Sequence, residues 1–438
     1  MALVIPTKFS FQGINPVYPP TNFVFCGSSH QIFNYGQISR NIGFTVESRL
    51  KCKHEKLFFQ LRAREYIARR LICRIRMYNQ IPRSQKLLFG LLGCVVLVCT
   101  LSSALTRTFN LEANAVDRSK QPTAGNHLDR VKERGYLICG VNGELPGFSF
   151  VNAEGQYEGI DVDLCRAVAA AIFDDPNLVR FRDLSAAERF DVLKSGEIDI
   201  LSRNTTLTLS RDADEGLEFT PPIFYDAQGM LVKDDGKIEK LSQLANKAIC
   251  VTEDTTSYDN LQDYLTQTQI KAKIIASDDS DVLFNAYEHD RCQAITADVS
   301  QLVTRKTLLA NPEDHLILNE TISQEPLAPA LVHRDSQWFD IVKWVTFALI
   351  QAEELNITSD NFNLYDRSRD TSIRRFLGLE GSLGRDMGLS NDFARRIIEH
   401  VGNYGEIYNR NLTQPFGLER NRNALWTNGG LMYSPPFN

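Results

Sequence analysis

One segment of the chain combines residue types that can bind a small charged molecule. Residues 199–211 (DILSRNTTLTLSR) place hydroxyl and amide groups after a short apolar stretch and end on Arg211. Such a loop can hold an ammonium group, and a guanidinium can bind a carboxylate through two parallel hydrogen bonds. In a second interpretation, Thr206 and Thr208 cap the next helix and Arg211 pairs with a neighbouring carboxylate. Local chemistry supports the two interpretations equally.

The motifs of common catalytic sites are absent from the sequence. It contains no P-loop, no G-x-S-x-G, no H-E-x-x-H, no C-x-x-C and no dinucleotide-binding glycine pattern. The seven histidines lack the spacing of metal ligands, so neither a metal nor another cofactor is expected. Asp161 and Asp163 could form an acid/base pair, but an acidic residue at a helix start is the simpler interpretation.

The elements around this segment alternate between strand and helix. A helix ending at Gly135 is followed by a strand, helix, strand, helix and strand, expected over residues 136–142, 160–173, 179–185, 186–197 and 198–205. A second round begins near Leu241, with strands expected in 248–256, 271–277 and 292–298 and helices over 257–268 and 279–290. This order predicts an α/β fold with parallel strands between helices. Two such units with a cleft between them are typical of hinge-bending binding proteins.

Charge and hydropathy divide the chain near residue 115. Residues 1–115 carry 15 Lys or Arg and 4 Asp or Glu, whereas residues 116–438 carry 33 and 50, a net charge of −17. Such an acidic part, without a basic stripe, argues against nucleic-acid binding. An apolar run at 87–104 follows a basic stretch and precedes the A-x-A pattern at 113–115, which predicts a signal peptide over 87–115.

The same apolar run could instead serve as a membrane anchor, because about 18 apolar residues can just span a bilayer. Either way, the positive charge before it places the later chain outside the cytoplasm. Residues 1–86 receive no predicted fold. Met77 would start a signal of ordinary length, so residues 1–76 are interpreted as an upstream extension of the reading frame or a disordered cytoplasmic tail.

Four of the nine cysteines follow the apolar run, an even number that suggests disulfides in an exported chain. Connectivity does not follow from sequence alone. We predict that Cys139 pairs with Cys165 and Cys250 with Cys292. Each of these bridges would stay within one α/β unit, whereas a bridge across the cleft would resist opening.

Several stretches resemble the type-2 periplasmic binding proteins for polar amino acids. They include GIDVDLCRAVAAAIF, LKSGEIDILSRNTTLTLSR, FTPPIFYDAQGMLV and ITAD. SRNTTLTLSRD, with NYGEIYNRNL at 403–412 and NALWTNGGLMYSPP at 423–436, is similar to the general L-amino-acid-binding class of the Aap/Bzt type. The resemblance implies two lobes, each a mixed sheet flanked by helices, with a hinge and an inter-lobe ligand cleft. The expected divisions are 128–231 and 232–328 for the two lobes, with 329–438 returning to the first lobe as a mainly helical segment.

The resemblance also implies roles for individual residues. Arg211 would bind the ligand α-carboxylate, and Thr206 would add a hydroxyl and a backbone N–H. The carbonyl of Asn204 and the carboxylate of Asp298 would receive the α-ammonium. Thr256 would lie where a helix N-terminus offers N–H groups to the carboxylate, as helix-end electrostatics favours independently.

Four positions depart from the family pattern or add to it. Asp254 replaces a glycine, at a place where Asp tolerates unusual backbone angles less easily than Gly. Leu145 stands where narrower relatives often have an aromatic residue over the ligand side chain, and Asn142 replaces an Asp that faces basic side chains. Arg203 is an added cation that could receive acidic side chains or lie in a solvent-facing ion pair. Acidic and neutral polar L-amino acids are therefore the expected ligands.

The leading expectation is a periplasmic, monomeric transport receptor that binds L-amino acids, catalyses nothing and delivers its ligand to the permease of an ABC importer. One alternative is a cyclohexadienyl or arogenate dehydratase-like enzyme on the same fold, with Glu144 or Glu253 as the acid. Another is a membrane-anchored amino-acid sensor domain. A dehydratase would turn its ligand over, whereas a receptor would release it unchanged.

Overall fold

The computed structural model describes residues 127–213, 216–333 and 335–438. The predicted signal or anchor segment and residues 1–86 lie outside these ranges. Within them, none of the helices combines the length and apolar character needed to cross a bilayer.

The first sheet contains five strands in the order β5-β1-β6-β15-β7. Their bounds are β1 (Leu137–Val141), β5 (Val179–Asp183), β6 (Ile200–Leu201), β7 (Leu217–Phe219) and β15 (Ala330–Val332). β1 pairs in parallel with β5 and β6, whereas β15 is antiparallel to β6 and β7. The parallel pairs need long crossover connections, which helices α4 (Ile160–Phe173) and α5 (Arg189–Ser195) provide. This confirms the predicted α/β class.

Helix α4 illustrates how the sequence sets a boundary. Gly159 precedes it with φ 130°, and a Cβ built there would lie 2.0 Å from the carbonyl oxygen of Phe148, so a side chain has no room. The helix begins at the next residue and ends before Asp174, which adopts the left-handed conformation. Most residues of the helix are small and apolar, and they are buried. A three-stranded antiparallel sheet packs beside the helix and consists of β2 (Glu144–Leu145), β3 (Ser149–Val151) and β4 (Tyr157–Glu158).

The second sheet follows the order β11-β10-β12-β9-β13. Its strands are β9 (Gln228–Lys233), β10 (Ala248–Thr252), β11 (Lys273–Ser277), β12 (Ala294–Asp298) and β13 (His315–Ile317). Helices α7 (Thr256–Thr268), α8 (Ser280–Glu288) and α9 (Val299–Lys306) cover it. Two separate apolar clusters, one containing Leu261 of α7 and the other Tyr287 of α8, pack the helices against the sheet. All five residues of β12 are buried, as expected for a strand that is covered on both faces.

Two strands join the sheets and form an antiparallel ribbon of their own. β8 (Phe224–Asp226) leads into β9, and β14 (Glu325–Leu327) leads back toward β15. The expected division between residues 231 and 232 falls inside β9, whose residues pair in the second sheet.

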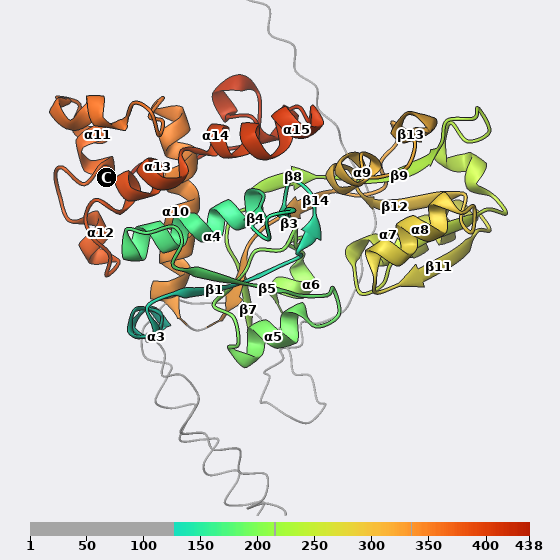
Figure 1. The fold of residues 1–438 in the computed structure, drawn as a ribbon, viewed down its shortest axis with the longest axis horizontal. Coiled ribbons are helices and arrows are strands. Elements are labelled where there is room, and N and C mark those ends of the chain that lie inside the picture. Colours follow the sequence, from blue (N-terminus) through green and yellow to red (C-terminus); the bar gives the residue numbers. More distant parts are fainter. Residues whose placement is uncertain (1–126, 214–215, 334) are drawn as a thin grey trace, which may run out of the picture. The chain divides into compact units, whose positions relative to one another are not determined.

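The remaining helices gather around the first sheet. They are α3 (His127–Arg134), α6 (Leu209–Asp212), α10 (Ser336–Glu354), α11 (Thr371–Phe376), α12 (Leu383–Asp386), α13 (Phe393–Val401), α14 (Tyr404–Tyr408) and α15 (Gln414–Phe416). α13 packs against α4 and α10, and α11 to α13 lie on the side away from the second sheet (Figure 1). One apolar cluster runs from β1 through these helices to Phe437.

Each sheet region contains one disulfide. Cys139 of β1 is bonded to Cys165 of α4, across 26 residues of sequence. Cys250 of β10 is bonded to Cys292, just before β12, across 42 residues. Neither bridge joins the two sheets, so both leave the β8/β14 ribbon free to bend.

Candidate ligand-binding site

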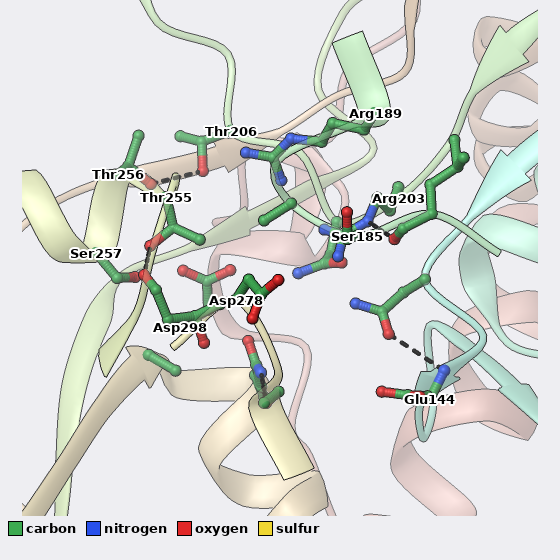
Figure 2. Close-up of a pocket in the computed structure, with 18 of the residues that line it drawn as sticks. Glu144, Ser185, Arg189, Arg203, Thr206, Thr255, Thr256, Ser257, Asp278 and Asp298 are labelled. Carbon is green, nitrogen blue, oxygen red and sulfur yellow. Dashed lines mark hydrogen bonds between the residues drawn. The ribbon is translucent and has the colours of Figure 1, made fainter. Parts of the chain in front are cut away.

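A cavity of about 350 Å³ lies between the two sheets. Seven of the eight residues expected to bind ligand line it: Asn142, Arg203, Asn204, Thr206, Arg211, Thr256 and Asp298. Figure 2 shows part of this wall, with Arg189, Arg203 and Thr206 from the first sheet region and Thr255, Thr256 and Asp298 from the second. The fold therefore brings together positions that are almost 160 residues apart in sequence.

The loop after β6 forms the first wall and is held from behind by α4. Asp161 accepts hydrogen bonds from the Ser202 hydroxyl and the Asn204 N–H, both at 2.8 Å. Burial raises the pKa of Asp161 to about 6, although both hydrogen bonds oppose the shift. Asn204 adopts φ 36°, and its side-chain oxygen has no hydrogen-bond partner. Asp161 therefore acts as a structural support at the start of α4. The loop that it positions carries an acceptor without a partner, the side-chain oxygen of Asn204.

Three arginines supply positive charge to the cavity. Each donates to a backbone carbonyl: Arg189 to Asp254 at 3.1 Å, Arg203 to Leu184 at 2.7 Å and Arg211 to Thr206 at 2.8 Å. No carboxylate of the described ranges forms an ion pair with any of them, and Nε of Arg189 has no acceptor.

The buried surroundings of these arginines disfavour their charged forms. Burial lowers the pKa of all three, to about 10 for Arg203 and well below the usual value for Arg189, where the other two guanidinium groups add repulsion. A cation that is buried without a partner binds an anion strongly. The cavity is therefore suited to carboxylate groups.

Asp298 supplies the opposite charge on the second wall. It ends β12, is 7 % exposed, and its carboxylate accepts no hydrogen bond from the described part of the chain. Burial raises the pKa of Asp298 well above its usual value, and the nearby Asp226 and Glu325 raise it further. Arg211 and Arg189 oppose this shift. An ammonium group placed beside Asp298 would relieve the same cost.

The N-terminus of α7 completes the second wall. Thr255 caps the helix by accepting from the Tyr258 N–H at 3.2 Å, and the Thr256 hydroxyl donates to Glu325 at 2.9 Å. The hydroxyls of Thr256 and Thr206 lie 3.3 Å apart across the cavity (Figure 2). Asp254, where the family resemblance implies a glycine, adopts φ 55°, so this turn does require the left-handed conformation. The helix end favours a carboxylate here.

Leu145 is the expected residue that does not line the cavity. Successive residues of a strand point to opposite faces, so in β2 Glu144 lies at the cavity wall while Leu145, 2 % exposed, packs in the apolar core. Burial raises the pKa of Glu144, and repulsion from Asp281 and Asp279 adds to the effect. Glu253, the other acid considered for catalysis, is outside this cavity.

The structure bears on both local interpretations of residues 199–211. Thr208 caps α6 by accepting from the Arg211 N–H at 3.3 Å, as the capping interpretation required. The Arg211 guanidinium nevertheless faces the cavity and makes no ion pair with any described residue. Arg203 is buried at 8 % exposure, which excludes the solvent-facing ion pair.

Arg189 and a group of acidic residues on the cavity wall were not predicted from the sequence. Arg189 opens α5 and carries no local signature, because only the orientation of that helix brings its guanidinium to the cavity. The acidic group consists of Asp183, Asp278 and Asp279. No cluster of His, Cys, Asp and Glu suited to a metal ion occurs in the described ranges. The arrangement pairs buried cations with one buried anion and is complementary to a zwitterion.

Comparisons with known proteins agree with this chemistry. The chain is 44 % identical over 313 residues to the general L-amino acid-binding periplasmic protein AapJ of Rhizobium johnstonii, covering 70 % of this chain and 92 % of that protein. It is 42 % identical over 313 residues to the glutamate/glutamine/aspartate/asparagine-binding protein BztA of Rhodobacter capsulatus, covering 71 % and 93 %.

A solved structure extends the likeness to the fold. The periplasmic binding protein of an ABC transporter from Brucella ovis, with glutathione bound, matches with a TM-score of 0.71 and 42 % identity. The match covers 72 % of this chain and 100 % of that one. The profile of the bacterial extracellular solute-binding proteins, family 3, matches residues 137–363, more than half of the chain. The protein therefore belongs to family 3 of the bacterial extracellular solute-binding proteins.

Proposed function

We propose that this protein is the extracytoplasmic binding component of an ABC amino-acid importer. The observation that carries the proposal is the cavity wall, where Asp298 and three arginines that form no ion pair with any described residue line one cavity. An L-amino acid supplies one ammonium and at least one carboxylate, so it neutralises both walls at once. The relatives support the same class of ligand, because one is named for binding general L-amino acids and the other for binding glutamate, glutamine, aspartate and asparagine.

We assign the α-carboxylate to Arg211, Thr206 and the N-terminus of α7. The α-ammonium is assigned to Asp298 and to the carbonyl of Asn204. Arg203 then remains for the ligand side chain, with Asn142 nearby, which favours acidic and neutral polar side chains over Lys and Arg. Because the charged contacts are made to the part that all amino acids share, specificity is broad.

Capture works by closure of the two lobes over the ligand. Contacts from both walls favour the closed form in proportion to the difference in affinity between the closed and open forms. We propose that the closed, monomeric protein delivers its ligand to the permease subunits on the outer side of the cytoplasmic membrane. The periplasmic relatives support this location. Residues 87–104 would act as the h-region of a cleaved signal or as an anchor.

Titration calorimetry of the full chain tests the proposal. We expect binding of Glu, Asp, Gln and Asn, weaker binding of Lys and Arg, and no heat from D-isomers or simple amines. Glutathione, the ligand of the Brucella protein, belongs in the same panel. Absence of binding to every L-amino acid would refute the proposal. Mass spectrometry of the recovered ligand should show it unchanged, since turnover of arogenate or prephenate would favour the dehydratase alternative.

A further inference from the structure

The two strands that connect the lobes change partners at neighbouring positions. In the first crossing, where β8 leads into β9, the carbonyl of Ala227 accepts from the Val299 N–H at 2.8 Å and the carboxylate of Asp226 accepts from Ser300. Asp226 and Ala227 are therefore held by the second lobe. In the second crossing, Glu325 accepts from Thr256 of the second lobe. The next residue, Pro326, is held by the first lobe, through the N–H of Leu207 at 2.8 Å.

These positions define where the hinge bends. Asp226 is the register partner of Glu325, and Tyr225 is the partner of Pro326. Both crossings therefore pass from one lobe to the other at the same level of the ribbon. Rotation of the lobes must be absorbed there, by a few backbone dihedral angles.

The C-terminal segment holds the first-lobe side of this hinge. The side-chain amide of Asn423 accepts from the Tyr225 N–H at 2.7 Å and donates to the Tyr225 carbonyl at 3.1 Å. One primary amide thus supplies both bonds that a neighbouring strand would supply. The Tyr404 hydroxyl donates to the Ile223 carbonyl at 2.7 Å, and the Tyr408 ring stacks on Phe224 at 6.0 Å.

Arg420 anchors this group to the body of the first lobe. It forms two hydrogen bonds to Glu353 of α10, at 2.8 and 3.0 Å, and donates to the Asn423 carbonyl at 2.9 Å. Its guanidinium also lies over the rings of Tyr404 and Tyr408. We call Tyr404, Tyr408, Arg420 and Asn423 the C-terminal clamp. All four lie beyond residues 137–363, the part matched by the family profile.

A second cavity of about 260 Å³ lies between the clamp and the second lobe. Arg420, Asn423 and Tyr408 line one side, and Val299, Ser300 and Thr321 line the other. Its width must change when the lobes rotate about Asp226, so the clamp side and the α9 side can move apart while Tyr225 stays fixed.

We propose that the C-terminal clamp fixes the hinge strand at Tyr225 and thereby controls how readily the lobes close over the ligand. The structure has hydrogen bonds across the cleft, from Arg189 to the Asp254 carbonyl and between Thr206 and Thr256, with the clamp engaged. Loss of the clamp leaves the pivot undefined, so the closed arrangement becomes a smaller fraction of the ensemble. Apparent affinity falls with that fraction, although no ligand contact is altered.

Asn423→Ala in the full chain tests the proposal, with Asn428→Ala as the matched control. Asn428 belongs to the same segment, is exposed, and its side chain has no hydrogen-bond partner among the described residues. Removing two hydrogen bonds should raise the Kd for L-glutamate about 5- to 30-fold, measured by calorimetry. The control should stay within about twofold. An unchanged Kd in a folded Asn423→Ala protein would overturn the proposal.

Hydrogen exchange separates hinge control from a purely local role and does not depend on the proposed ligand. Without ligand, Asn423→Ala should speed exchange at residues 221–227 and also at 252–258, in the cleft wall opposite, because the lobes open more often. Faster exchange confined to 221–227 would mean that the clamp only supports local structure, and would overturn the proposal. If Asn423→Ala does not fold, Tyr404→Phe replaces it. Tyr433→Phe is then the control, because Tyr433 lies outside the clamp, is exposed, and its hydroxyl forms no hydrogen bond with any described residue.

Discussion

Truncation of Arg211 is the most direct test of the binding site. The guanidinium donates once within the described protein, to the Thr206 carbonyl, and Arg211 lines the cavity. Arg211→Ala therefore removes ligand contacts and only one internal hydrogen bond. Arg211→Lys keeps the positive charge but loses the planar pair of donors that matches a carboxylate.

The size of the effect follows from the burial and charge of the cavity. Truncating one partner of a buried, hydrogen-bonded charge pair costs about 2–5 kcal/mol, which corresponds to roughly a 30- to 5,000-fold rise in Kd. Arg189 and Arg203 remain and retain part of the attraction, so the lower half of this range is expected for ligands with two carboxylates. Neutral ligands such as Gln should suffer the larger loss. Arg211→Lys should lie between the parent and Arg211→Ala.

Calorimetry with L-glutamate and L-glutamine measures both variants against the parent and against Arg180→Ala, an exposed arginine on β5. Melting temperatures of all four proteins should agree within a few degrees, because Arg211 supports little of the core. A folded Arg211→Ala protein with near-parent affinity would show that this arginine is structural and that the carboxylate assignment is wrong.

Three further predictions concern charge and covalent links. Arg203→Ala should raise the Kd for Glu and Asp more than that for Gln and Asn, and an unchanged ratio by calorimetry would contradict the side-chain assignment. Asp298 has a raised pKa in the free protein, and a bound ammonium favours its ionised form. Binding should therefore release protons and weaken as the pH falls through that pKa. Binding enthalpies that do not depend on the ionisation enthalpy of the buffer would oppose this. The Cys250–Cys292 loop spans 42 residues, so replacing both of these cysteines by Ala should lower the unfolding free energy by about 4 kcal/mol. Identical denaturant midpoints for this variant and the parent, or free thiols at Cys250 and Cys292 by peptide mapping, would refute the pairing.

The sequence predicted an element best where local signals mark both of its ends. The helix expected over 160–173 has those bounds in the structure, because glycine before it and a left-handed Asp174 after it set both ends. The strand expected over 198–205 is much shorter. Only Ile200 and Leu201 pair, because the chain turns away at Asn204 with its positive φ.

Site residues could be predicted where they belong to a recognisable motif of the sequence. Arg211 and Asp298 carry recognisable family motifs, and the structure places both at the cavity. Leu145 does not line the cavity, because neighbouring residues of a strand point to opposite faces, and Glu144 lines it instead. Arg189 was missed because it reads as an ordinary first-turn residue, and only tertiary packing of α5 reveals its position.

The path of the chain through the first sheet also sets an order of folding. β15 lies between β6 and β7, yet it is synthesised after the whole second lobe. The second lobe is one continuous stretch that contains its own sheet, apolar clusters and disulfide, so it can fold as soon as it emerges. The first sheet must wait, since β7 has no strand partner until residues 330–332 arrive, and contacts of such sequence separation form slowly. The ligand cavity, which needs both lobes, can therefore form only after residues 330–332 have been synthesised.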